Sequence, residues 1–180
     1  VVNEFVQAHG GSIEIVDVAD PNNPVSLGTI PAHSMGTTVV RDGIAYVASD
    51  EGLKIFDVSN PPVPLLLGSS ADSGNSTRDI SVHGSYVFKS NNAGVLTVFE
   101  LTDQNSLIRV ATGTAAGNIR SIVADENYVY AANYSDGLKI FRNERAGLRL
   151  EVAPAGQDAG FQVLNGTPGG HYVLERTTGL

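Results

Sequence analysis

The chain has 180 residues, 42% of them hydrophobic, and its 19 Asp and Glu outnumber its 11 Lys and Arg, which gives a formal net charge of −8. No apolar run approaches the ~18 residues of a membrane-spanning helix, and the basic residues form no cluster, so we expect no membrane insertion and no nucleic-acid binding. Cysteine is absent, which excludes disulfides and thiolate metal sites.

Short runs rich in β-branched residues recur along the chain and predict strands joined by tight turns. Four of these runs align with one another, at 12–18, 52–58, 95–101 and 137–143, and their offsets are 40, 43 and 42 residues. Aromatic residues form a second column at offsets of 41, 42 and 42, made of Phe5, Tyr46, Phe88 and Tyr130. The chain is therefore built on an internal repeat of about 42 residues.

Each repeat unit predicts four strands. The first strands are expected at 36–41, 77–82 and 119–124, and the second strands at 44–49, 85–90 and 128–133. The aligned runs above are the third strands, and the fourth strands are expected at 24–30, 64–70, 107–113 and 147–153. Turn residues with positive φ should join the first strand to the second, at Asp42-Gly43, His83-Gly84 and Glu126-Asn127.

Four short strands per unit, with apolar residues on both faces, indicate an all-β fold of propeller blades, because each blade must pack on two neighbours. We expect residues 1–153 to form a partial β-propeller of four-stranded antiparallel blades, about three and three-quarter blades in all. Two columns should fill the core between blades. These are Ile13, Leu53, Leu96 and Leu138, and Val16, Phe56, Phe99 and Phe141.

The stretches Ile13–Pro24 and Gly52–Pro61 resemble the LVIVD repeat. The third copy has Glu100 and no following proline, and the fourth has Arg142-Asn143, so both depart from the pattern. The resemblance implies a secreted or cell-surface β-propeller of bacteria or archaea, without an assigned activity and without catalytic residues.

The repeat pattern ends before a stretch of small residues. Residues 154–160 are expected to be a linker, and residues 161–180 to be the start of a second β module. The strand-turn-strand pattern of 161–180 is similar to the opening of a β-sandwich-like C-terminal module of secreted bacterial proteins. We therefore expect the chain to be a piece of a longer protein, truncated at both ends.

Few residues suggest chemistry. No nucleotide-binding, zinc-helix or nucleophile-elbow motif is present, and the four histidines fall at different repeat positions, so we expect no catalytic residues, no metal and no cofactor. Asp17, Asp57 and Glu100 recur just before a turn, where a carboxylate accepts backbone N–H groups, and we prefer this role to calcium binding. The acids of the turns at 50–52 and 135–137 are expected to be solvated.

Arg78 and Arg120 stand at the start of the first strand in two units, with Thr37 in the remaining copy. This strand is expected to line the central channel, and alternation would place Arg78 on the face of Ile80 and Val82. Pairing with neighbouring acids or backbone carbonyls is one interpretation. The other is a positive ring at the channel mouth that binds an anionic or polyhydroxyl ligand through the planar guanidinium groups.

These features favour a non-catalytic binding or scaffold propeller of a secreted or cell-surface bacterial protein, with a glycan or protein ligand at the channel mouth. The alternative is a propeller enzyme, of the metal-dependent hydrolase class, whose catalytic residues lie outside this fragment. A purely structural spacer is a third hypothesis. The remaining blades should come from the parent chain.

Limited proteolysis tests the domain boundary. We expect the primary cleavage between residues 154 and 160, because this stretch has few apolar residues to anchor it. Mass spectrometry of the products locates the cut. Primary cleavage within 40–140 that leaves 154–160 intact would contradict the boundary.

Overall fold

The computed structural model describes residues 3–8, 12–32, 34–70, 77–102, 106–115, 117–134, 137–142 and 151–153, with the backbone alone for 3–8, 34–35 and 151–153. All regular structure in these segments is β, and the strands form four antiparallel sheets. The all-β class and the blade architecture predicted from the repeat are thus confirmed. The predictions for 147–150, 154–160 and 161–180 lie outside the described residues.

Each sheet is one blade, and its strands pair in chain order. Blade 1 contains β1 (Asn3–Ala8), β2 (Ser12–Asp17) and β3 (Val25–Ile30). Blade 2 contains β4 (Ser34–Arg41), β5 (Ile44–Ser49), β6 (Gly52–Asp57) and β7 (Leu65–Ser69). Blade 3 contains β8 (Thr77–His83), β9 (Tyr86–Asn91), β10 (Val95–Leu101) and β11 (Leu107–Thr114). Blade 4 contains β12 (Ile119–Ala124), β13 (Tyr128–Asn133), β14 (Gly137–Arg142) and β15 (Glu151–Ala153).

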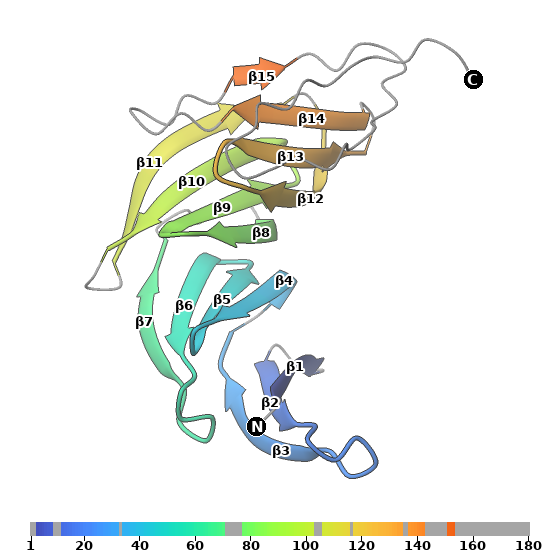
Figure 1. The fold of residues 1–180 in the computed structure, drawn as a ribbon, viewed down its shortest axis with the longest axis vertical. Coiled ribbons are helices and arrows are strands. Elements are labelled where there is room, and N and C mark those ends of the chain that lie inside the picture. Colours follow the sequence, from blue (N-terminus) through green and yellow to red (C-terminus); the bar gives the residue numbers. More distant parts are fainter. Residues whose placement is uncertain are drawn as a thin grey trace, which may run out of the picture.

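The blades stack face to face in an open arc (Figure 1). β4, β8 and β12 lie along the concave side, whereas β3, β7 and β11 lie along the convex side. The innermost strands of adjacent blades contact one another, β4 with β8 and β8 with β12. The arc is a partial, open β-propeller whose concave surface is formed by the first strand of each unit.

Apolar side chains that alternate along the strands fill the space between blades. Leu53 and Ile55 of β6 pack toward blade 3, whereas Phe56 of the same strand packs toward blade 1. The same arrangement holds between blades 3 and 4, where Leu96 and Phe141 meet in one cluster. Burying a side chain of this size contributes roughly 1.5–3 kcal/mol, so these clusters hold the arc together.

The residues of the two predicted core columns are buried where they face a neighbouring blade. Phe56, Phe99 and Phe141 are buried, as are Ile13, Leu53 and Leu96. Val16 of blade 1 and Leu138 of blade 4 are only half-buried. They face away from the other blades, and no described residue forms a further blade against them.

A β-bulge recurs in the pairing of the third strand with the fourth. It lies between Ile15 and Val16 in blade 1, Ile55 and Phe56 in blade 2, and Val98 and Phe99 in blade 3. Because a bulge increases the local twist, its repetition bends each outer strand at the same level.

The hairpin turns only partly follow the sequence prediction. Asp42 and Gly43 have φ of 51° and 77°, as a two-residue turn of type I′ requires. The second turn is shifted by one residue, since His83 pairs with Tyr86 and Gly84 has φ of 58°.

The prediction for the third turn is wrong, because neither Glu126 nor Asn127 has a positive φ. The Asp125 carboxylate shapes this turn instead, by accepting the N–H groups of Asn127 at 2.7 Å and Tyr128 at 2.8 Å. A side chain can thus close the turn without left-handed backbone.

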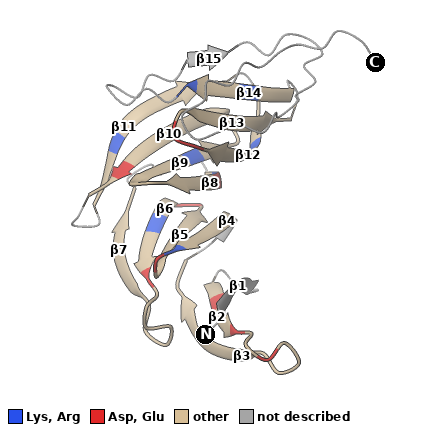
Figure 2. Ribbon diagram, viewed as in Figure 1, with Lys and Arg blue, Asp and Glu red and all other residues tan. Residues whose placement is uncertain are grey.

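Charged residues are dispersed over the blades (Figure 2). Among the described residues no helix is long and apolar enough to cross a membrane.

The packing between blades can be tested at Phe99, which is 3% exposed and lies between blades 2 and 3. We expect Phe99→Ala to lower the free energy of unfolding by about 3–5 kcal/mol, because it leaves a cavity at this interface. The matched control is Val63→Ala in a turn, where the side chain is 67% exposed and the change should stay within about 0.5 kcal/mol. Urea denaturation measures both, and equal effects would contradict the packing assignment.

Candidate functional site

The first strands of blades 2, 3 and 4 all begin at the same end of the concave surface. We call this end the mouth and define it by Thr37 of β4, Arg78 and Asp79 of β8, and Arg120 and Ser121 of β12. It includes the three residues predicted from the sequence as ligand contacts, Thr37, Arg78 and Arg120. The turns between the second and third strands lie at the same end, because neighbouring strands are antiparallel.

Asp79 lies at the centre of the mouth and is only 5% exposed. Its Oδ1 accepts a hydrogen bond from the Thr37 hydroxyl of blade 2. The same oxygen accepts a second one, at 3.0 Å, from the N–H group of the next residue, Ile80. Its Oδ2 accepts from blade 4, from Ser121 Oγ at 2.8 Å and from Ile122 N–H at 2.7 Å. One buried carboxylate therefore joins three blades, and its four hydrogen bonds compensate for its removal from water.

The hydrogen bonds also correct the alignment of the repeats. Thr37 and Ser121 each lie 42 residues from Asp79 and bind it directly. Thr37 is therefore the equivalent of Asp79 and Ser121, not of the arginines as the sequence alignment assumed. The equivalent of Arg78 in blade 2 is Gly36, where an added Cβ would lie 2.3 Å from the Arg78 carbonyl oxygen. Blade 2 has no room for an arginine there.

Arg78 and Arg120 occupy the same unusual backbone position. In β8 the pairing passes from Thr77–Asn91 to Asp79–Ser90, so that Arg78 is the extra residue of a β-bulge. In β12 Arg120 is the extra residue in the same way, between Ile119 and Ser121. The bulge interrupts the alternation that would place Arg78 on the face of Ile80 and Val82, so this expectation does not hold.

Arg120 is exposed and lies against an aromatic ring. Its guanidinium carbon is 4.9 Å from the ring centroid of Tyr134, and Tyr134 is 76% exposed. Such a contact is typically worth about 0.5–1 kcal/mol at an exposed site, and it limits the directions that the guanidinium can take. Within the described segments no carboxylate forms an ion pair with Arg78 or Arg120.

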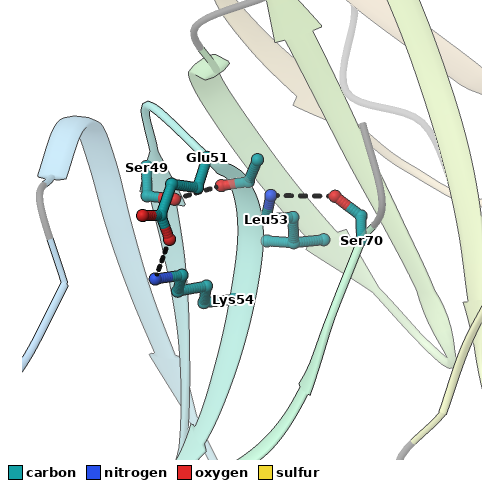
Figure 3. Close-up of polar contacts among 6 residues, drawn as sticks. Ser49, Glu51, Leu53, Lys54 and Ser70 are labelled. Carbon is teal, nitrogen blue, oxygen red and sulfur yellow. Dashed lines mark hydrogen bonds and ion pairs between the residues drawn. The ribbon is translucent and has the colours of Figure 1, made fainter. Parts of the chain in front are cut away.

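The turn between β5 and β6 shows how this end of a blade is held (Figure 3). Ser49 Oγ donates to the Gly52 carbonyl at 2.7 Å, and Leu53 N–H donates to Ser70 Oγ at 2.9 Å. Glu51, expected to be solvated, is exposed and also forms an ion pair with Lys54 at 2.5 Å. One acid of this turn thus has a partner within its own blade, and the other, Asp50, is exposed.

The acids at the opposite end of the blades have the structural role predicted for them in two of three copies. Asp17 Oδ1 accepts Ala19 N–H at 2.9 Å, and Asp57 Oδ1 accepts Ser59 N–H at 2.8 Å. The bond from Ser59 lowers the pKa of the Asp57 carboxyl. In blade 3 Thr102 takes this role, two positions after the predicted Glu100, and its Oγ1 accepts Ser106 N–H at 3.2 Å.

Other candidate chemistry can be placed only in part. The described segments contain no group of three or more His, Asp or Glu side chains that could hold a metal ion. His83 is exposed, whereas His9, His33 and His171 lie outside the described residues. Asn133 begins the glycosylation acceptor triplet 133–135, but it is 5% exposed, so the folded blade does not present it for modification.

The LVIVD repeat family matches residues 38–72 and 116–141. The chain carries LVIVD repeats. One match covers most of blade 2, and the other runs from before β12 into β14 of blade 4 and ends at residue 141, just before the departure from the pattern at Arg142. The copy at 13–24 lies outside the matched ranges. No curated protein matches the chain.

Sequence reasoning missed Asp79 and Ser121 as parts of the mouth. A signal was present, because a strict spacing of 42 residues brings Thr37, Asp79 and Ser121 into one polar column within otherwise apolar strands. The repeats were instead aligned on their LVIVD-type third strands, whose spacings include 40 and 43 residues. This alignment shifted the first strands by one residue relative to one another.

The role of Asp79 can be tested by substitution. We expect Asp79→Ala to lower the free energy of unfolding by about 3 kcal/mol, because it leaves the buried N–H groups of Ile80 and Ile122 without this acceptor and removes the links to Thr37 and Ser121. Asp50→Ala is the matched control, an exposed acid of a turn at the same end, and should change it by about 0.5 kcal/mol or less. Thermal and urea denaturation measure the difference, and equal stability of the two variants would show that Asp79 does not join the blades.

Proposed function

We propose that this chain is part of a non-catalytic binding propeller of a secreted or cell-surface bacterial protein, with a glycan or protein ligand at the mouth. The observation that carries the proposal is the placement of Arg78 and Arg120. Both are inserted by a β-bulge at the start of adjacent innermost strands, and bulges are frequent where a strand must re-aim a side chain toward a ligand.

The chemistry of the mouth supports binding rather than catalysis. Asp79 is the one acid of the mouth, and its two oxygens already accept four hydrogen bonds. A guanidinium group donates hydrogen bonds and accepts none, so the two arginines are suited to orient an anion. Together they offer fixed donors with a planar geometry, which suits recognition.

We propose further that blades of the parent chain complete the ring. The half-buried Val16 and Leu138 support this, since their equivalents in the other blades are buried by a neighbouring blade. Secretion is supported only by the resemblance of the repeats to those of secreted and surface proteins.

Screening the chain against glycan, metabolite and protein arrays tests the function. We expect at least one ligand that the R78A/R120A double variant no longer binds. R41A is the matched control, because Arg41 is exposed, ends β4 at the opposite end of the blade and contacts only its neighbour Asp42 among the ion pairs described.

Two outcomes would contradict the proposal. If every ligand found binds the double variant as well as the parent chain, the mouth is not the binding site. If a bound ligand is hydrolysed by the parent chain but not by the double variant, the mouth is catalytic.

A further inference from the structure

The hydroxyls of the mouth have only acceptor capacity left for a ligand. A Ser or Thr hydroxyl has one hydrogen to donate and two lone pairs to accept with. Thr37 and Ser121 donate that hydrogen to Asp79. Both residues are exposed, so they present oxygen lone pairs at the concave surface, while their hydrogens bind the Asp79 carboxylate.

The arginines beside these hydroxyls present the opposite chemistry. Arg78 and Arg120 directly precede Asp79 and Ser121, and a guanidinium can only donate. The chain as a whole has 19 acidic residues against 11 basic ones, yet no ion pair to either arginine is found in the described segments. The mouth thus combines hydroxyl oxygens that can accept from O–H or N–H donors with cations that favour an anionic partner.

Two buried polar atoms close in sequence to the arginines have no hydrogen-bond partner among the residues that the structure describes. One is Oγ1 of Thr77, a residue 1% exposed that directly precedes Arg78, and the other is Oδ1 of Asn118, two residues before Arg120. The Asn118 oxygen can only accept, so the group that satisfies it must be a donor. Both atoms are enclosed by the protein, so a ligand could reach them only after a local rearrangement.

These requirements together exclude simple ligands. A small inorganic anion would meet the arginines but would face the lone pairs of Thr37 and Ser121 and the charge of Asp79. A neutral sugar would satisfy the hydroxyls but leave the guanidinium groups without an anionic partner. An acidic peptide offers carboxylates and backbone N–H donors, so the comparison with tetraglutamate below tests it directly. The exposed ring of Tyr134, held against Arg120, adds an apolar face suited to the C–H groups of a sugar ring.

We infer that the mouth binds a carbohydrate that carries carboxylate groups, a uronate-containing glycan. Its carboxylate pairs with Arg78 and Arg120, and its ring hydroxyls donate to Thr37 and Ser121. This inference rests on the proposed function, because it names the ligand class of the same site.

Isothermal titration calorimetry of the 180-residue chain tests it, with trigalacturonate as the probe. We expect trigalacturonate to bind and its methyl ester, in which the carboxylates are neutral, to bind roughly tenfold to a hundredfold more weakly, as loss of charge-assisted hydrogen bonds predicts. The R78A/R120A variant should lose a similar factor, R78K/R120K should recover only part of it, and R41A should bind as the parent chain does.

The controls separate the possible failures. Equal binding of the methyl ester, or stronger binding of tetraglutamate than of trigalacturonate, would overturn the acidic glycan as the ligand class. Failure of trigalacturonate to bind, while the arrays give another ligand that requires Arg78 and Arg120, overturns this inference and leaves the proposed function standing. Binding of trigalacturonate that the double variant retains overturns both.

Discussion

The fold depends on one constraint, which is that every blade must be apolar on both faces and must therefore be covered on both. Successive residues of β6 show how this is met, since Ile55 packs toward blade 3 and Phe56 toward blade 1. A strand whose residues alternate between two buried faces reads as a continuous apolar run, and its flanking turns must carry the polar residues. The spacing of the repeat then fixes which residues of adjacent blades meet.

A propeller of separate sheets has a second problem, because the innermost strand of each blade has an unpaired edge. Here side chains take the place of a backbone ladder. The N–H groups of Ile122 and Ala124 in blade 4 donate to Asp79 Oδ2 and to Ser81 Oγ in blade 3, at 2.7 and 3.0 Å. Thr37 reaches the same carboxylate from blade 2. Polar residues on the concave side are therefore as much a part of the architecture as the apolar clusters between blades.

The sequence was sufficient to predict the blades because apolar periodicity, turn residues and repeat spacing all indicate the same strands. It was not sufficient for the mouth. The bulges at Arg78 and Arg120 insert one residue each, and neither residue type nor alternation indicates a bulge in advance. The role of Asp79 depends on contacts between residues 42 and 43 positions apart, which exist only once three blades are stacked. The turn at Asp125 was mispredicted because a carboxylate can replace the backbone conformation that the residue types suggested.

The repeats are alike where they build the core and differ where they meet at the mouth. Phe56, Phe99 and Phe141 are equivalent and all buried, because any change there would open an interface between blades. At the mouth the equivalent positions hold Gly36, Arg78 and Arg120. The glycine is required by the close approach of the Arg78 carbonyl, so blade 2 accommodates its neighbour while blades 3 and 4 supply the cations. Because the core does not demand arginine at either place, packing between blades does not account for these two residues, and this is the reason for proposing them as ligand contacts.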